Sequence, residues 1–317
     1  MVKTTGAGQK IDEATGTATV GHEWDGIEEL NTPLPRWWVL TFYASILFAI
    51  GYVVVYPAIP LLSKGTEGLW GWTSRGQLAA EKTAGDAIHA KVRADLANVP
   101  IEELGGKPEL LAAAVAGGKA AFRVNCVQCH GAQGGGSAPG TAAGYPNLAD
   151  NDWLWGGDLK AIETTLINGI RSPDNTATRM SLMPNFGKDG ILTPAQVTDV
   201  ANHVLSLTGK AAPTGSGAAL FAANCATCHG PEGKGLRQFG APNLADAIWL
   251  YGGKPSEVRA SVTVAHAGQM PAWGTRLDPV TIKMLAAYVH SLGGGEKFAP
   301  VPATPAAAPA ATAAQGK

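Results

Sequence analysis

The five residues CVQCH at positions 126–130 recur as CATCH at positions 225–229. In the pattern Cys-x-x-Cys-His, the two thiols can add across the vinyl groups of a haem, and the adjacent histidine can bind the iron. The chain has four cysteines, and the two motifs use all of them. The motifs therefore predict two covalently bound haem c groups, attached at Cys126, Cys129, Cys225 and Cys228, with His130 and His229 as proximal iron ligands.

Other interpretations of a Cys-x-x-Cys pair explain less of the pattern. A structural zinc site would need four closed ligands, and a redox dithiol would normally open a helix in a βαβ context. Neither these nor a disulfide accounts for a histidine placed directly after the second cysteine in both copies.

Two methionines in matching contexts are the candidates for the second axial ligands. Met183 opens the sequence MPNFG and Met270 opens MPAWG, each downstream of one haem motif. Ligation by histidine and methionine raises the reduction potential of a haem and closes its iron to oxygen or peroxide. The pattern thus indicates an electron carrier. We expect each methionine to serve the haem of its own repeat, although two tandem domains could also exchange these loops.

Several other residues stay open as ligands. Met180 lies three residues before Met183 and could replace it, whereas Met284 falls in a helical pattern that favours a core position. His203 is expected to be an ordinary surface or core histidine, and His290 is a further candidate near the haem domains. His266 lies just before Met270 and keeps a bis-histidine site as an alternative.

The two haem motifs belong to an internal duplication. The sequence PNLAD occurs at 146–150 and again at 242–246, and each copy is followed by a tryptophan at the same spacing, Trp153 and Trp249. A Gly-x-x-x-Phe pattern precedes each haem motif, and Thr193-Pro194 and Asp278-Pro279 are typical helix starts. The first repeat carries an insertion around residues 171–180, which we expect to form a surface loop.

The order of elements in each repeat resembles the class I cytochrome c fold: a helix, the haem motif, a loop, a methionine loop and a closing helix. We predict an all-α protein with two tandem class I cytochrome c domains, residues 111–209 and 215–292. Each haem supplies much of the apolar core that so short a segment would lack.

An uncharged, apolar stretch at residues 37–62 predicts a single transmembrane helix. Some 36 residues precede it and no small-x-small cleavage site follows, which argues against a signal peptide. We assign 1–36 to an N-terminal arm and 63–110 to a connector with a helix at 75–96. The first 20 residues and the Ala/Pro-rich tail, 293–317, are expected to be disordered. The net charge of −1 argues against a nucleic-acid partner.

The positively charged residues near the helix do not settle its orientation, because Arg36 lies on one side and Lys64 and Arg75 on the other. Haem c is attached in the bacterial periplasm. The haem domains and connector are therefore expected to be periplasmic, and the N-terminal arm cytoplasmic.

The arm sequence GHEWDGIEELNTPLPRWW, residues 21–38, followed by a membrane helix and two haem motifs, closely resembles the dihaem subunit (subunit III) of cbb3-type cytochrome c oxidases. The resemblance extends to about residue 292. Some members of that family have two N-terminal membrane helices, and this chain has one candidate. The arm, with Trp24 and its acidic residues, is a candidate contact with partner subunits, or else a solvated segment.

The resemblance implies an electron-transfer subunit of a respiratory complex in a bacterial inner membrane. Such a subunit takes electrons from a donor cytochrome c or the cytochrome bc complex and passes them to a monohaem cytochrome subunit. From there they reach the catalytic haem/copper subunit, which reduces oxygen and pumps protons for oxidative phosphorylation. The subunit itself is not the site of oxygen reduction. By transfer, the four motif cysteines hold the porphyrins, and the axial ligands are His130, Met183, His229 and Met270.

Two alternative functions remain at this point. A membrane-anchored dihaem carrier for a periplasmic dehydrogenase fits the haem domains equally well and differs mainly in the arm. A dihaem peroxidase needs one iron with an open or displaceable sixth position, and a methionine motif in both repeats argues against it.

Overall fold

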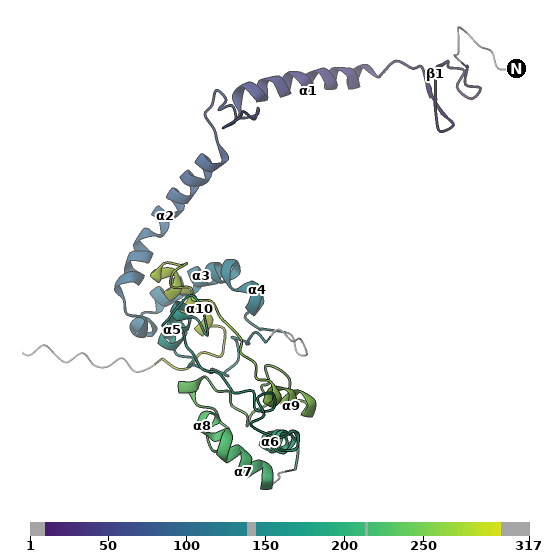
Figure 1. Cartoon of the computed structure of the whole chain (residues 1–317). Helices are drawn as coiled ribbons and strands as arrows, with labels where there is room; N and C mark the ends of the chain where they lie inside the picture. The colour runs from purple at the N-terminus through teal and green to yellow at the C-terminus, as the bar shows by residue number, and fades with distance from the viewer. Residues whose placement is uncertain (1–9, 138–143, 213–214, 299–317) are drawn as a thin grey trace, which may run out of the picture. The chain divides into compact units, whose positions relative to one another are not determined.

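The computed structural model describes residues 10–137, 144–212 and 215–298 (Figure 1). It divides into two compact units, Met1–Ile88 and His89–Lys317, which we call unit 1 and unit 2. The fold is mostly helical, with one candidate membrane helix and two haem-motif repeats, which confirms the predicted class. Residues 1–9 and 299–317 lie outside the described segments, so their predicted disorder stays a prediction.

The N-terminal arm contains a β-hairpin that we did not expect. Strands β1 (Thr19–Trp24) and β2 (Ile27–Leu30) pair antiparallel, with Trp24 opposite Ile27. Asp25 and Gly26 between them have φ angles of 49° and 84°, the geometry of a two-residue turn that Asp-Gly adopts readily. The predicted disorder of the first 20 residues is therefore wrong for residues 10–20, where Ile11 also bridges Ala18.

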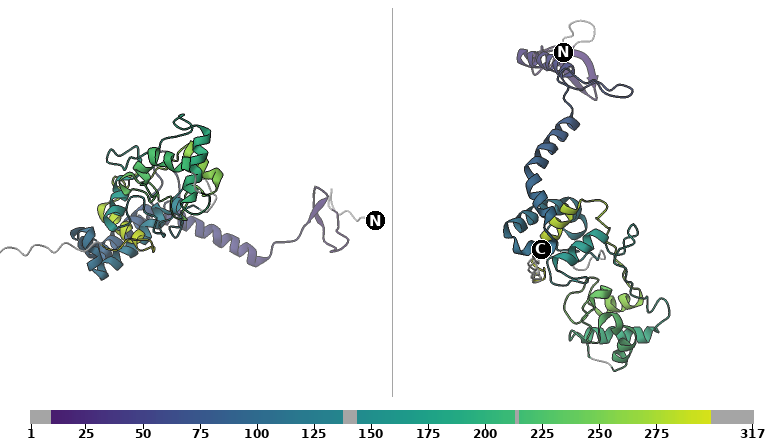
Figure 2. Two further views of the ribbon diagram at one scale, coloured as in Figure 1. Left: turned by 90° about the horizontal axis from the view of Figure 1, so that it is seen from below. Right: turned by 90° about the vertical axis from the view of Figure 1, so that its left-hand side faces the viewer.

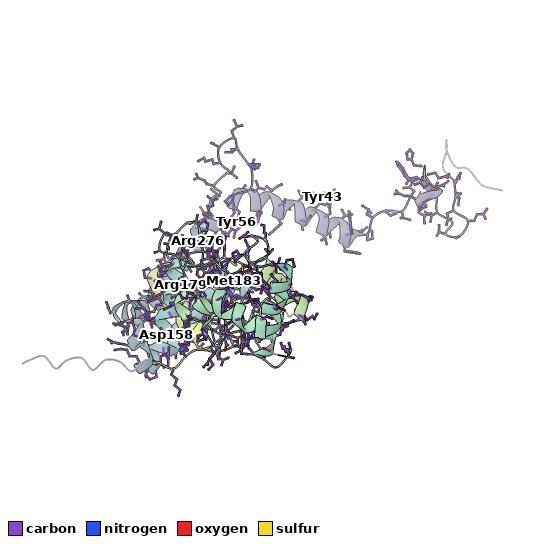
Figure 3. All side chains as sticks on the ribbon, turned by 60° about the horizontal axis from the view of Figure 1, so that its bottom comes forward. Tyr43, Tyr56, Asp158, Arg179, Met183 and Arg276 are labelled. Carbon is purple, nitrogen blue, oxygen red and sulfur yellow. The ribbon has the colours of Figure 1, made fainter. Side chains whose placement is uncertain are left out.

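Helix α1 (Arg36–Val55) is the candidate membrane span. It is 20 residues long with a mean hydropathy of 2.1, and none of its residues is buried. Its side chains, Tyr43 among them, project outward from the helix (Figure 3). The helix ends earlier than the predicted residue 62, because Tyr56 is extended and Pro57 has no N–H to continue it.

The chain turns back at the end of α1. Residues 57–72, which we call the returning hairpin, bond to the last turn of the helix: the Leu69 amide donates to the Val54 carbonyl at 3.0 Å, and the Trp70 amide to the Val55 carbonyl at 3.3 Å. Helix α2 (Ser74–Asn98) follows, as the pattern at 75–96 predicts.

Unit 2 holds both repeats. The first contains the 3₁₀ helix η1 (Ile101–Gly106) and helices α3 (Pro108–Asn125), α4 (Val127–His130), α5 (Leu159–Asn168) and α6 (Pro194–Ser206). The second contains α7 (Gly215–Asn224), α8 (Ala226–His229), the 3₁₀ helix η2 (Arg237–Phe239), α9 (Pro255–Thr263) and α10 (Pro279–His290). The predicted caps are confirmed: Thr193 and Asp278 accept amide hydrogen bonds at the starts of α6 and α10.

The two hydrophobic cores do not follow the repeats. Helix α10 packs on α3 and α5, and helix α6 packs on α7 and α9 (Figures 1 and 2). Each core thus combines the first helix of one repeat with the closing helix of the other. We call the α3/α5/α10 assembly bundle A and the α6/α7/α9 assembly bundle B. The predicted ranges 111–209 and 215–292 describe the sequence repeats, whereas each folded bundle takes its closing helix from the other repeat.

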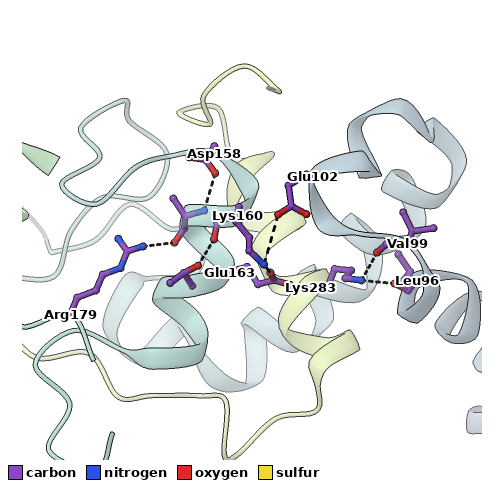
Figure 4. Close-up of polar contacts among 10 residues, drawn as sticks. Leu96, Val99, Glu102, Asp158, Lys160, Glu163, Arg179 and Lys283 are labelled. Carbon is purple, nitrogen blue, oxygen red and sulfur yellow. Dashed lines mark hydrogen bonds and ion pairs between the residues drawn. The ribbon is translucent and has the colours of Figure 1, made fainter. Parts of the chain in front are cut away.

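Bundle A is held by a close contact between α3 and α10. A Cβ atom at Gly118 would lie 2.0 Å from the Met284 carbonyl oxygen, and the Phe122 and Tyr288 rings meet edge to face at 5.2 Å. Met284 is buried there, as its helical pattern predicts. The Lys283 ammonium also donates to the carbonyls of Leu96 and Val99, at 2.7 and 2.6 Å, and so joins α10 to the end of α2 (Figure 4).

Candidate haem-binding sites

Each Cys-x-x-Cys-His motif folds as one helical turn directly after a longer helix. In both copies the amide of the second cysteine donates to the carbonyl of the first at 3.2 Å, and the histidine amide donates to the same carbonyl at 2.9 Å. Residues three and four apart share a helix face. The turn therefore presents both thiols and the imidazole of a motif on one side, and all four thiols are free.

The two motif histidines are held in the form that binds a metal. His130 Nδ1 lies 3.2 Å from the Pro146 carbonyl oxygen, and His229 Nδ1 lies 3.1 Å from that of Pro242. A proton on Nδ1 that is donated to this carbonyl leaves the Nε2 lone pair for iron. Burial lowers the pKa of both imidazoles, which favours the neutral ligand form. This contact gives the repeated PNLAD segment a physical role.

The first cysteine of each motif lies in an apolar environment. Burial raises the pKa of the Cys126 thiol to about 11, and it raises that of Cys225 to about 11 as well. Zinc ligation and dithiol exchange both need the thiolate, which such surroundings disfavour. The two cysteines belong instead to hydrophobic cores, as expected of thioether positions beside a porphyrin.

The Met270 loop of the second repeat lies on bundle A. Met270 and Ile170 exchange backbone hydrogen bonds at 2.9 and 3.0 Å, and the Trp273 amide donates to the Leu166 carbonyl at 2.9 Å. Ile170 and Leu166 belong to the first repeat. Met270 and Trp273 are half-buried against the core that contains Cys126.

The Met183 loop of the first repeat lies on bundle B. The Lys188 amide donates to the Thr263 carbonyl at 3.0 Å, and the Ala265 amide donates to the Asn185 side chain at 3.0 Å. Phe186 is buried in the core that contains Cys225. Met183 is 37 % exposed and Met180 66 % exposed, which favours Met183 as the ligand of the pair.

This packing favours an exchange of the methionine loops between the repeats over the expected pairing within each repeat. It places Met270 with the motif at 126–130, and the Met183 loop with the motif at 225–229. The insertion at 171–180 contributes to this exchange, because Ser172 is buried and its hydroxyl accepts the Ala272 amide at 3.2 Å. The expected surface loop thus supports the Met270 loop of the other repeat.

The two repeat-related tryptophans differ in their hydrogen bonding. Trp153 Nε1 donates to the Gly294 carbonyl at 2.6 Å. Trp249 Nε1 is buried and has no hydrogen-bond partner within the described residues, and the Lys210 ammonium lies 5.1 Å from the centre of its ring. A buried N–H needs an acceptor. A haem carboxylate is a suitable one, so the residues around Cys225 fit the group that their motif predicts.

The other three histidines of the two repeats occupy structural positions. His203 packs on Phe221 at 5.1 Å between ring centres, where the first bundle has Tyr288 on Phe122. His290 contacts the Glu296 carbonyl and the Phe298 ring. His266 stacks on Tyr251 at 3.8 Å. These contacts favour the core or surface role predicted for His203.

Sequence reasoning missed the positioning role of Arg179. Its guanidinium donates to the carbonyls of Trp155 and Ala161 at 2.8 and 3.2 Å, and it lies 5.3 Å from the centre of the Trp155 ring. Figure 4 draws the hydrogen bond of Arg179 to α5. It therefore joins the loop before the Met183 motif to the start of α5. The signal was present in the repeat, because Arg179 and His266 both lie four residues before an axial-ligand candidate. They stack on Trp155 and Tyr251, which occupy equivalent positions after the two PNLAD segments.

The carboxyl of Asp152 makes stability depend on pH. Burial raises its pKa to about 6, with smaller contributions from Asp246 and Asp150. The folded state holds this proton more tightly than the unfolded chain does. The protonated carboxyl therefore makes its full contribution to stability below the ordinary pKa of an aspartate. That contribution is lost as the pH rises through about 6. We expect Asp152→Asn to raise the thermal unfolding midpoint at pH 7 and to leave it nearly unchanged at pH 4. Equal shifts at the two pH values would contradict this.

Comparison with known proteins gives three family matches and several close relatives. Residues 16–63 match the N-terminal domain of cytochrome oxidase-cbb3, FixP; residues 115–208 match cytochrome c; and residues 212–289 match cytochrome c oxidase, cbb3-type, subunit III. The subunit FixP of Azorhizobium caulinodans is 51 % identical over 90 % of this chain and 96 % of its own length. The subunit CcoP of Cereibacter sphaeroides is 48 % identical over 88 % of this chain and 95 % of its own.

Proposed function

The chain belongs to the family of cbb3-type cytochrome c oxidase subunit III, and we propose that it takes electrons from a donor cytochrome c or the cytochrome bc complex and passes them to the monohaem cytochrome subunit. From that subunit they continue to the oxygen-reducing, proton-pumping catalytic subunit. As a member of this family, the chain is a membrane-anchored electron-transfer subunit and not the catalytic one. The observation that carries the proposal is the pair of motif histidines, each held by its Nδ1 on a backbone carbonyl.

Each bundle would hold one haem c. Bundle A would attach its haem at Cys126 and Cys129, with His130 and Met270 as axial ligands. Bundle B would attach its haem at Cys225 and Cys228, with His229 and Met183. When bound, a haem carries one electron by cycling between ferric and ferrous iron. The protein's part is to keep the imidazole neutral and oriented, to fill the sixth position with a thioether, and to exclude water from the core.

The orientation follows from the attachment chemistry. Haem c is attached in the periplasm, so residues after α1 would lie there and the N-terminal hairpin in the cytoplasm. Binding to the other oxidase subunits would then involve both sides of the membrane.

The decisive experiment is purification from membranes in mild detergent, followed by pyridine haemochrome analysis. Two haem c per chain, together with haem b, copper and oxygen consumption, is the expected result. Two haem c without haem b or oxygen uptake would leave a dihaem carrier and contradict the assignment to an oxidase. One haem c per chain would contradict the two-site proposal.

Trp249 offers a test of the second site. A hydrogen bond from its indole to a haem carboxylate would draw negative charge away from the iron, so Trp249→Phe should lower the potential of one haem by tens of millivolts in an optical redox titration. Trp153→Phe is the matched control, because that indole already donates to Gly294. Equal shifts in both variants would contradict the predicted difference.

A further inference from the structure

We propose that the returning hairpin, residues 57–72, is a lipid-binding element that lies in the interface of the bilayer at the end of α1. This inference rests on the membrane anchoring of the family and concerns unit 1 alone. Its occupant is the headgroup and upper acyl region of the lipid.

The hairpin satisfies the backbone of the helix end. The last carbonyls of an α-helix have no partner within the helix and normally bond to water. Here the Tyr56 amide donates to the Tyr52 carbonyl at 2.8 Å, and the Leu69 and Trp70 amides reach back to the carbonyls of Val54 and Val55. Such capping is needed where water is scarce, because each unsatisfied polar group in lipid costs several kcal/mol.

The hairpin also satisfies much of its own backbone. The Thr66 amide donates to the Ile59 carbonyl at 2.9 Å, and the Leu61 amide to the Lys64 carbonyl at 2.7 Å. The Thr66 hydroxyl accepts the amides of Ala58 and Ile59 at 3.2 and 3.1 Å. A loop closed in this way can enter the interface without exposing these groups to lipid.

The outer surface of the hairpin is apolar. Leu69 is 79 % exposed and Trp70 69 % exposed, and Leu62 is fully exposed. The described charges of the hairpin, Lys64 and Glu67, are paired with each other at 2.9 Å. This surface continues directly from α1, none of whose residues is buried. Contiguous apolar surface of this kind marks a contact with a membrane or a partner.

The aromatic residues and the length of α1 favour lipid. The ring centre of Tyr56 lies 5.2 Å from that of Trp70 and 5.6 Å from that of Trp72, both edge to face. Tryptophan and tyrosine gather at membrane interfaces. A 20-residue helix spans about 30 Å, the thickness of the hydrocarbon core. The hairpin bonds to the final turn of that helix and so lies at the boundary.

Gly68 is the position on which this fold-back depends. Its φ is +69°, and a Cβ atom there would lie 2.3 Å from the Val55 carbonyl oxygen. Gly71 has a similar φ of +60° but open space around it, with nothing within 4 Å. Gly68→Ala should therefore detach the hairpin from α1. Gly71→Ala places an alanine at a similar positive φ but causes no clash, so the hairpin should stay attached.

The test is spin labelling of the full chain in the assembled complex, reconstituted in phospholipid vesicles. If the four native cysteines are thioethers, a cysteine introduced by Leu62→Cys is the one reactive thiol of this chain, and the signal of the labelled parent complex is subtracted. Labelling of the parent chain itself would show separately that the haem proposal fails. We expect the label at 62 to collide several-fold more with oxygen than with a water-soluble nickel chelate. A label introduced by Ala84→Cys, on the exposed surface of α2, should show the reverse.

Three results would overturn the proposal. Nickel access at 62 equal to that at 84 would place the hairpin in water. Low access to both reagents at 62 would place it against a protein partner. Gly68→Ala should raise nickel access at 62 several-fold while Gly71→Ala leaves it unchanged, and equal behaviour of the two variants would refute the capped geometry.

Discussion

Replacing Met270 with alanine should lower the potential of the haem attached at Cys126 and Cys129, and leave that of the haem at Cys225 and Cys228 almost unchanged. The reason is the packing of the Met270 loop on bundle A, where it bonds to Ile170 and Leu166 of the first repeat. Loss of the thioether should cost on the order of 200 mV, within the range of about 0.8 V over which axial ligands set haem potentials.

The assignment needs chains that retain one haem. We would make Cys126→Ser/Cys129→Ser and Cys225→Ser/Cys228→Ser, confirm one haem per chain by pyridine haemochrome, and combine each with Met183→Ala or Met270→Ala. In the chain that keeps only the haem at 225–229, Met183→Ala should lower the potential and Met270→Ala should not. The opposite outcome would return the ligands to their own repeats.

Gly118→Ala should destabilise the protein strongly, whereas Gly117→Ala should not. Both changes improve the helix propensity of α3 by up to about 1 kcal/mol. A Cβ at 118, however, meets the Met284 carbonyl at 2.0 Å, which is rigid backbone, whereas a Cβ at 117 meets the end of the flexible Met284 side chain. Overpacking of this kind costs typically about 1–3 kcal/mol. Here the α3–α10 contact would have to open, which favours the upper end of that range.

The readout has two parts. Thermal unfolding followed by circular dichroism should show a lower midpoint for Gly118→Ala than for Gly117→Ala. Because α10 follows the Met270 loop in the chain, the same substitution should also disturb the haem at 126–130 more than the haem at 225–229. A stable Gly118→Ala protein with unchanged potentials would mean that α3 and α10 are not in the contact described here.

Much of this architecture could be predicted from the sequence. The caps at Thr193 and Asp278, the helix after residue 74 and the membrane span follow from local patterns, and the haem ligands lie in motifs that repeat. The hairpin of the arm was also predictable, since Asp25-Gly26 between two alternating segments favours a two-residue turn.

The exchange between the bundles was not predictable in the same way. Helices α5 and α9 are equivalent in the two repeats. The MPNFG and MPAWG loops can therefore bond to similar backbone carbonyls on either helix. Local sequence therefore fits both topologies. The difference lies in long-range contacts such as Ser172 with Ala272 and Gly118 with Met284, whose partners are far apart in the chain.

The exchanged closing helices have a consequence for biogenesis. As the chain is synthesised, α3 and the motif at 126–130 are made before the second repeat, yet α10 is the last helix to be made. Domains generally fold in order of synthesis. Here the first cytochrome must wait for the whole chain, and a product that stops after the first repeat would leave α3 without its partner. Bundle A is therefore completed last, after every helix of bundle B has been made.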